Sequence, residues 1–129
     1  MCIFCQIAAK EIPAKIIYED DEVLAILDIS QATRGHTLVM PKEHYANILE
    51  LPDDLAIHLN EVALTLAKKL NTKLEAAGCN ILTNVNEVAG QSVFHCHLHI
   101  LPRYDDDDLV IKFSAHPADL DEILAVINE

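Results

Sequence analysis

The chain of 129 residues contains no tryptophan, three glycines and only six phenylalanine and tyrosine residues (three of each). It has no continuous apolar run near the ~18 residues that a membrane-spanning helix needs. Its N-terminus lacks the charged and then apolar segments of a secretory signal. Neither an internal repeat nor a low-complexity linker divides it. These absences predict a single domain over residues 1–129, with an aliphatic core and a cytoplasmic location.

Basic residues are also scarce. Nine Lys and Arg stand against 21 Asp and Glu, so the formal net charge is −12. Proteins that bind nucleic acids normally carry a basic patch, and none is visible, so we expect neither nucleic acid nor an anionic membrane as a partner. A small anionic substrate is still allowed, because nearby imidazoles and N–H groups act over short, screened distances. The acidic run 105–108 is predicted to be a solvated loop rather than a cation site.

Apolar, partly β-branched segments bounded by turn residues predict a sheet. Two of them flank an acidic turn, which is typical of a hairpin, and the last coincides with a histidine-rich run. The expected strands are 15–18, 23–28, 36–40, 80–85 and 95–101.

The clearest helix begins at 52–54, where Pro and acidic residues suit a first turn. We expect it to run to about Ala77 and to end at Gly78 as a C-cap. Its apolar stripe is wide, which fits either burial on two sides, as in a homodimer, or one deep core. A helical turn over 3–9 and a C-terminal helix after Pro117 are also expected. Strands, a long helix and strands again predict an α+β fold with an antiparallel sheet.

Histidines alternate with apolar residues from His95 to Ile100. Alternation with a period of two is typical of a half-buried strand. One face is then expected to enter the core, and the other to carry three imidazoles about 7 Å apart. A single strand histidine is usually structural, whereas three in alternation indicate chemistry. The inward set is Cys96, Leu98 and Ile100, and the outward set is His95, His97 and His99.

This run resembles the signature of the histidine-triad (HIT) family, in which His-apolar-His-apolar-His is followed by two apolar residues. The resemblance covers nearly the whole chain, through the ordered blocks 3–5, 27–30, 35–39 and the triad. It is closest to the Hint-type branch of small nucleotide hydrolases and nucleotidyl transferases. It implies a five-stranded sheet in each subunit and a homodimer that joins two sheets.

The resemblance implies distinct roles for the histidines. Imidazole is a good nucleophile and is largely neutral near pH 7. By its place in the motif, His97 would attack phosphorus and form a nucleotidyl-histidine intermediate. His99 would cradle the α-phosphate as charge develops, and His36 would orient or polarise the triad. The alternative for His36 is a residue that merely ends a strand.

The segment just before the triad is expected to hold phosphate. The bend at Gly90 would let backbone N–H groups approach an anion closely. Gln91 and Ser92 would donate hydrogen bonds to phosphate oxygens and to the leaving group.

The resemblance also implies contacts to the nucleoside. Asp28 would accept hydrogen bonds from the ribose hydroxyls, although an Asp that caps the turn before Ser30 is an alternative. Asn84 matches an asparagine that contacts the sugar–phosphate region. An apolar slot for the base is expected from Phe4, Ile7, Leu27 and Ile29.

Cys2 and Cys5 form a Cys-x-x-Cys pair. In a cytosolic protein such a pair indicates metal or redox chemistry more often than a disulfide. The thioredoxin arrangement needs a preceding strand, and none is expected here. The resemblance supplies His44 and His95 as two further ligands, which would complete a structural zinc site. The alternative is two ordinary thiols with His44 on the surface.

Together these features predict a hydrolase or nucleotidyl transferase that cleaves at the α-phosphate of nucleoside phosphoramidates, acyl nucleotides or dinucleoside polyphosphates. An AMP-type purine nucleotide is the expected substrate unit, and no organic cofactor is expected. One alternative is a nucleotide sensor or scaffold with residual turnover. Another is a metallohydrolase whose three triad histidines hold a catalytic metal. The remaining cysteines and histidines are predicted to be non-catalytic: Cys79, Cys96, His58 and His116.

Overall fold

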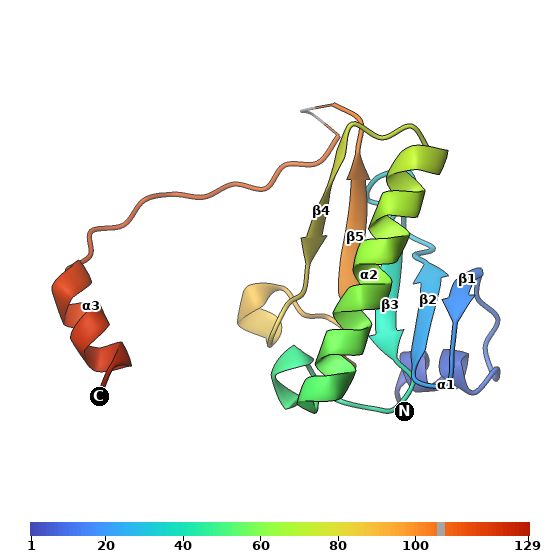
Figure 1. Ribbon diagram of the computed structural model, residues 1–129, viewed down its shortest axis with the longest axis horizontal. Coiled ribbons are helices and arrows are strands. Elements are labelled where there is room, and N and C mark those ends of the chain that lie inside the picture. Colours follow the sequence, from blue (N-terminus) through green and yellow to red (C-terminus); the bar gives the residue numbers. More distant parts are fainter. Residues whose placement is uncertain (106–107) are drawn as a thin grey trace.

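The computed structural model describes residues 1–105 and 108–129. Within those ranges the strands form one five-stranded sheet in the order β1-β2-β3-β5-β4, and every neighbouring pair is antiparallel (Figure 1). This confirms the predicted α+β class and antiparallel sheet. The strands are β1 (Ile16–Glu19), β2 (Val23–Leu27), β3 (Thr37–Pro41), β4 (Gly78–Leu82) and β5 (Leu98–Arg103).

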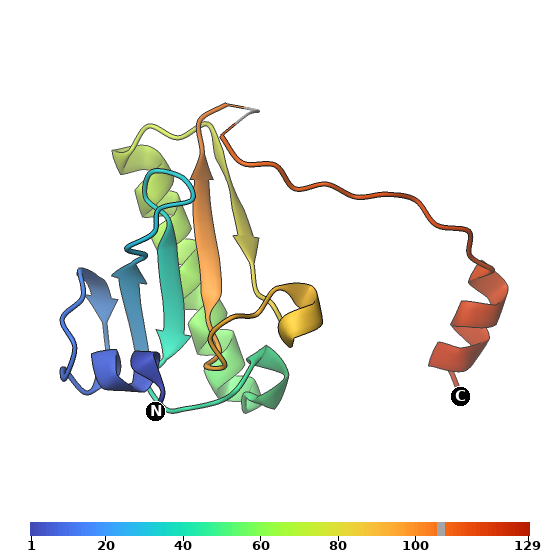
Figure 2. The same ribbon diagram turned by 180° about the vertical axis from the view of Figure 1, so that it is seen from behind.

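The central strands are covered on both faces. Helix α2 (Asp53–Lys73) lies along one face, and the short helix α1 (Ile3–Ala8) lies behind the other (Figures 1 and 2). Strand β2 therefore reads as a continuous apolar run rather than an alternating one, as is usual for a strand buried on both sides. Its side chains divide between two clusters: Val23 and Ala25 meet α2, whereas Leu24 and Ile26 meet α1.

One face of α2 supplies the larger cluster. Its buried residues recur every three or four positions, which is the spacing of one helix face. They are Leu55, Leu59, Val62, Ala63, Leu66 and Ala67. On the outer side, Ile57 and Leu64 remain 60% and 54% exposed within one chain. Helix α2 thus presents one wide apolar face to a single deep core, and the described residues leave Ile57 and Leu64 on its outer side uncovered.

The predicted end of α2 is wrong. The helix ends at Lys73, and Glu75 rather than Gly78 takes the left-handed conformation that follows it, with a φ of 57°. The Ala77 N–H already donates to the carbonyl of Arg103, so the chain has joined the sheet by that point. Gly78 consequently opens β4, and this strand runs over 78–82 instead of the expected 80–85.

The predicted strand over the triad is also partly wrong. Strand β5 begins at Leu98, so only His99 of the three histidines lies in it. Strand β3 pairs with β5 only as far as Leu98. Just before Leu98, the Cys96 N–H donates to the carbonyl of Tyr45 instead. The expected burial of the apolar set is confirmed: Cys96, Leu98 and Ile100 lie in the α2 cluster.

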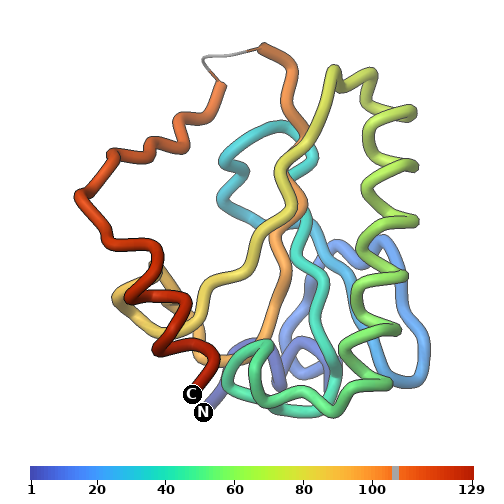
Figure 3. The backbone as a smooth tube through the Cα atoms, turned by 60° about the vertical axis from the view of Figure 1, so that its left-hand side comes forward, coloured from blue at the N-terminus to red at the C-terminus, as the bar shows by residue number. Residues whose placement is uncertain are grey.

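The C-terminal segment extends away from this body. Residues 110–129 are all exposed, and α3 (Leu120–Ile127) lies well apart from the sheet (Figures 1 and 2). Figure 3 traces the chain from residue 108 to α3. The predicted helix exists, because the Asp119 carboxylate caps its first turn by accepting from two backbone N–H groups. Its apolar side chains, however, pack on nothing within the described chain.

Within the acidic run 105–108, two residues lie outside the described ranges. Asp108 is not simply solvated, because its carboxylate accepts from Arg103 Nε at 2.5 Å and from the Tyr104 N–H at 2.7 Å. This pairing lowers the pKa of Asp108. Among the described residues, none of the helices is both long enough and apolar enough to cross a bilayer.

Candidate active site and metal site

His97 is held in the segment just before β5, where it is 9% exposed. Its Nδ1 lies 2.7 Å from the carbonyl oxygen of His95. A carbonyl only accepts, so Nδ1 carries the hydrogen and Nε2 keeps its lone pair. Burial lowers the pKa of His97, which keeps the ring neutral near pH 7. The Phe4 ring meets it edge-on, with centroids 5.0 Å apart.

His99, on β5, stands beside this ring with centroids 4.9 Å apart. Burial, followed by the neighbouring His97 and His36, lowers the pKa of His99 to about 4. Its Nδ1 lies 2.9 Å from Nε2 of His36. The sequence placed these three histidines in one site, and the structure brings them together.

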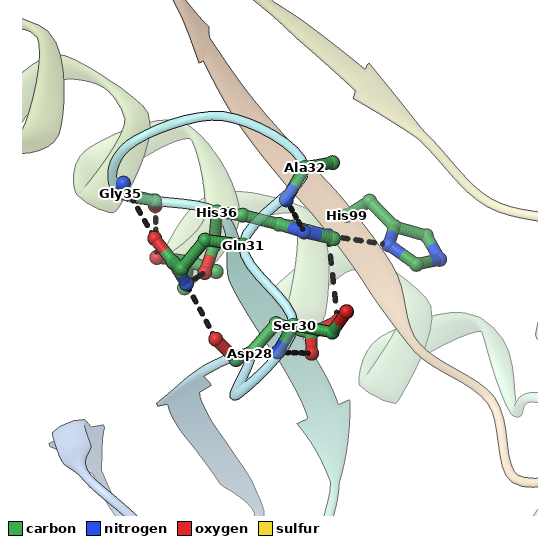
Figure 4. A network of polar contacts seen from close by, with 8 residues as sticks. Asp28, Ser30, Gln31, Ala32, Gly35, His36 and His99 are labelled. Atoms are coloured by element: carbon green, nitrogen blue, oxygen red, sulfur yellow. Dashed lines mark hydrogen bonds and ion pairs between the residues drawn. The ribbon is translucent and has the colours of Figure 1, made fainter.

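His36 immediately precedes β3 and is 6% exposed. Its Nδ1 accepts from the Ala32 N–H at 3.2 Å, and its Nε2 lies 3.7 Å from Oδ2 of Asp28 (Figure 4). His36 thus contacts both His99 and the loop before it, and its role in orienting the triad stays a prediction. Oδ1 of Asp28 accepts from the Ser30 N–H at 2.8 Å, which is the expected turn cap, whereas Oδ2 faces the histidine. The contact of Asp28 to ribose stays a prediction.

An apolar pocket adjoins Asp28. All four residues expected to form a base slot line it, together with others from α1 and the following loop. Ile29 at its edge is fully exposed. The pocket residues expected from sequence are Phe4, Ile7, Leu27 and Ile29.

The predicted role of Gln91 is not supported by its contacts. Its Nε2 donates to the carbonyls of Ala46 at 2.6 Å and Val93 at 3.1 Å, and its Oε1 accepts from the Asn86 N–H. The residue is 4% exposed. All three hydrogen bonds are internal, so the side chain anchors the loop instead of donating to a substrate.

The rest of the expected phosphate loop is open. Gly90 has a φ of 103°, which favours glycine, and a side chain there would meet the Asn84 amide at 3.6 Å. The predicted pair Asn84 and Gly90 is therefore adjacent in space. Ser92 is exposed, so its hydroxyl is accessible.

A second cluster lies on the other side of His97. Sγ of Cys5 lies 3.4 Å from Nδ1 of His44 and 3.5 Å from Nδ1 of His95, and Sγ of Cys2 lies 3.4 Å from the same His95 atom. The two imidazole nitrogens are 3.2 Å apart. These four residues could hold a metal ion, because one ligand atom from each lies within 4.8 Å of all the others.

Local hydrogen bonds orient three of these four ligands. Cys2 caps α1 by accepting the Cys5 N–H, which turns both thiols to one end of the helix. Nε2 of His95 donates to the carbonyl of Pro41 at 2.7 Å, so its Nδ1 presents a lone pair to the cluster. Burial lowers the pKa of His95, which favours the neutral, ligating form.

This geometry excludes a metal held jointly by the three triad histidines in the observed arrangement. Nδ1 of His95 faces the cysteines, whereas Nδ1 of His97 is bonded to a main-chain carbonyl. The triad therefore divides between two sites: His95 belongs to the metal cluster, and His97 and His99 belong to the candidate active site.

The family model for the HIT domain matches residues 9–106. The chain belongs to the HIT family. A HIT-like protein of Methanocaldococcus jannaschii, described as uncharacterised, is 50% identical over 130 residues and 99% of both chains. An adenylylsulfatase of Arabidopsis thaliana is 35% identical over 108 residues, which are 84% of this chain and 55% of the plant protein.

Solved HIT structures share the fold. A HIT family member from Bacillus subtilis superposes with a TM-score of 0.91 at 45% identity, over 98% of this chain and 94% of the other. A zinc-bound histidine triad family protein from Mycobacterium smegmatis gives 0.80 at 40% identity, over 89% and 84%.

One feature of this HIT domain was not predicted from its sequence. Gln31 and Ala32 lie in a polar loop that carries no recognisable motif, yet the Ala32 N–H contacts His36 of the candidate active site. His58, predicted to be non-catalytic, lies away from both sites and contacts Asp20 at 2.6 Å. His116 is exposed in the C-terminal segment.

Proposed function

We propose that this HIT protein is a nucleotide hydrolase or nucleotidyl transferase of the Hint type, with His97 as its nucleophile. The observation that carries the proposal is the hydrogen bond from Nδ1 of His97 to the His95 carbonyl. It leaves an unprotonated Nε2 on a buried, neutral ring beside His99. An imidazole in this state attacks phosphorus without a separate base.

In the first step, Nε2 of His97 bonds to the α-phosphorus, and the bond to the leaving group breaks with its electron pair on that group. An amine leaving group then takes a proton from solvent. In the second step, water attacks the same phosphorus, the P–N bond breaks, and its electron pair returns to Nε2. The products are a nucleoside monophosphate and the free enzyme, and the second step releases one proton.

The surroundings suit a nucleotide. Asp28 lies between the apolar pocket and His36, so its carboxylate can accept from ribose while the base occupies the pocket. The exposed hydroxyl of Ser92 can donate to the leaving group, and Asn84 beside Gly90 can contact the sugar–phosphate. The name of the adenylylsulfatase relative supports an AMP-type unit. Phosphoramidates, acyl nucleotides and dinucleoside polyphosphates are the substrate classes that we propose.

We propose zinc as the metal of the Cys2, Cys5, His44 and His95 cluster. Tetrahedral zinc, with bonds of about 2.3 Å to sulfur and 2.0 Å to nitrogen, separates its ligand atoms by roughly 3.3–3.8 Å. Four of the six separations among the ligand atoms are 3.2–3.5 Å and fit this requirement, and all six are within 4.8 Å. Four protein ligands close the coordination sphere, so the ion when bound would hold α1 against the segment that carries His97. The zinc-bound relative supports the assignment.

We also propose a homodimer. Supporting features are the outer α2 residues Ile57 and Leu64, the sheet-edge residue Ile81 on β4, and the uncovered apolar face of α3. A helix of eight residues is not stable alone in water, so α3 needs a packing surface. We also propose the predicted cytoplasmic location, because a Cys-x-x-Cys pair that binds a metal is typical of a reducing compartment.

Intact-protein mass after brief mixing with a fluorogenic adenosine phosphoramidate tests the nucleophile. We expect a gain of one adenylate mass, or steady release of AMP, in the native protein and in the control His58→Ala. His97→Ala is expected to lose both signals. Folded native protein that gives neither adduct nor AMP would contradict this substrate class. Turnover that survives in His97→Ala would contradict the nucleophile.

A further inference from the structure

Gln31 organises the loop between β2 and β3. Its Nε2 donates to the carbonyls of Asp28 at 2.5 Å and His36 at 2.8 Å, and its Oε1 accepts from the Gly35 N–H at 2.7 Å (Figure 4). A primary amide matches this environment, because it offers two donors and one acceptor in fixed positions. A carboxylate of the same shape would point acceptors at two carbonyl oxygens.

The loop is also held at its far end. Gly35 has a φ of 95°, and a Cβ there would lie 2.4 Å from a methyl carbon of Leu74. Only glycine therefore lets the loop approach the end of α2 so closely. The Tyr104 hydroxyl donates to the carbonyl of Arg34 at 2.6 Å. These contacts leave the path of the loop over His36 little freedom.

One consequence is the placement of the Ala32 N–H, 3.2 Å from Nδ1 of His36. A backbone N–H only donates, so this nitrogen carries no hydrogen and Nε2 of His36 does. Nε2 in turn lies 2.9 Å from Nδ1 of His99, which must accept. The competing oxygen of Asp28 is more distant, at 3.7 Å. His99 is thereby held with its own hydrogen on Nε2.

We propose that Gln31 is a positioning residue of the active site. By holding the Ala32 N–H against His36, it sets the tautomers of both His36 and His99. His99 then offers an Nε2–H donor to the phosphate where negative charge develops, next to the lone pair of His97. The role at phosphate rests on the proposed nucleotidyl transfer, whereas the tautomers do not depend on it.

Two variants test the inference. Gln31→Glu keeps the shape but opposes two carbonyls with a carboxylate, and Gln31→Met removes the hydrogen bonds without adding charge. Asn60→Asp, on α2, is the control for an amide-to-carboxylate change elsewhere. With the adenosine phosphoramidate we expect both Gln31 variants to lose about 10-fold to 100-fold in kcat. We expect KM to rise by a smaller factor than kcat falls, because every side chain that lines the nucleoside pocket is kept and only the hydrogen bond to the Asp28 carbonyl is lost there.

Nitrogen-15 NMR of the imidazoles at pH 7.5 supplies the second readout, which a merely structural role would not move. In native protein and in Asn60→Asp we expect unprotonated Nδ1 and protonated Nε2 on His36 and His99. In the folded Gln31 variants we expect mixed tautomers.

A protonated Nδ1 on either ring of the native protein would overturn the inference, whether or not the variants fold. Variants that retain both native tautomers would also overturn it. Native protein with the expected tautomers but no turnover, together with variants that lose those tautomers, would confirm the positioning role of Gln31. That result would contradict only the proposed function.

Discussion

Removal of the metal from the cluster of Cys2, Cys5, His44 and His95 is expected to destabilise the whole domain. The Cys2 and His95 ligands are 93 positions apart in the chain, so a shared ion closes a very long loop. By the chain-entropy relation for cross-links, a loop of this length contributes about 4–5 kcal/mol to the free energy of unfolding. In a domain of this size, the corresponding fall in Tm is roughly 15 °C.

Thermal unfolding followed by circular dichroism, with and without excess chelator, measures this effect, and elemental analysis gives the metal content. We expect one zinc per native chain, and loss of both zinc and the chelator response in Cys5→Ser. Cys79→Ala is the matched control, because Cys79 is a free thiol outside the cluster. Native protein without bound metal would refute the reasoning about this site. So would a chelator-induced fall of less than about 1 kcal/mol in the free energy of unfolding.

Three further predictions concern the rest of the molecule. Leu59→Ala, at a residue with no exposed surface, is expected to lower the free energy of unfolding by about 2–5 kcal/mol in urea titrations. The hydrogen bond to Asp20 raises the pKa of His58 above ~6.5. The stabilisation from the charged form of His58 is present below about pH 6.5, and it is lost as the pH rises through the raised pKa of His58. Burial favours the neutral carboxyl of Asp20, but the hydrogen bonds that its carboxylate accepts outweigh this effect and lower the pKa of Asp20. The stabilisation that this carboxylate provides is therefore lost only at acid pH. The stability difference between native protein and His58→Ala is therefore expected to be larger at pH 5.5 than at pH 9, and an equal difference would contradict the pairing. Native protein is expected to have the mass of two chains in light scattering, and deletion of 110–129 is expected to shift it towards one; a native mass of one chain would contradict the proposed dimer, and a deletion variant that keeps the mass of a dimer would contradict the role of α3 in it.

Local pattern predicted the elements well where one chain segment determines its own structure. The acidic hairpin turn and the acidic first turn of α2 both act within a few residues, and both are present. Alternation also predicted correctly that Cys96, Leu98 and Ile100 face the core. Boundaries failed where a distant partner decides them: α2 ends early because Ala77 pairs with Arg103.

The residues that the structure gathers into two clusters were also accessible, because the triad and the Cys-x-x-Cys pair are compact motifs and the HIT resemblance supplied His36 and His44. Their division between two clusters was expected from that resemblance alone and not from the strand pattern. A strand pattern cannot show that His95 turns towards two cysteines while His97 bonds to a main-chain carbonyl. It also cannot show that the side-chain amide of Gln91 donates to a main-chain carbonyl, that of Ala46.

The sequence by itself therefore determined the class of fold and the family to which the chain belongs, and it named the residues that the structure gathers into two clusters. Only the tertiary structure decided where β5 begins, which nitrogen of each imidazole carries a hydrogen, and how Gln31 reaches the site through Ala32. The physical reason is that periodicity and capping depend on neighbours in the chain. A tautomer or a strand end depends on hydrogen-bond partners that folding brings from far along it: His36 and His99 are 63 positions apart, and His95 and Cys2 are 93.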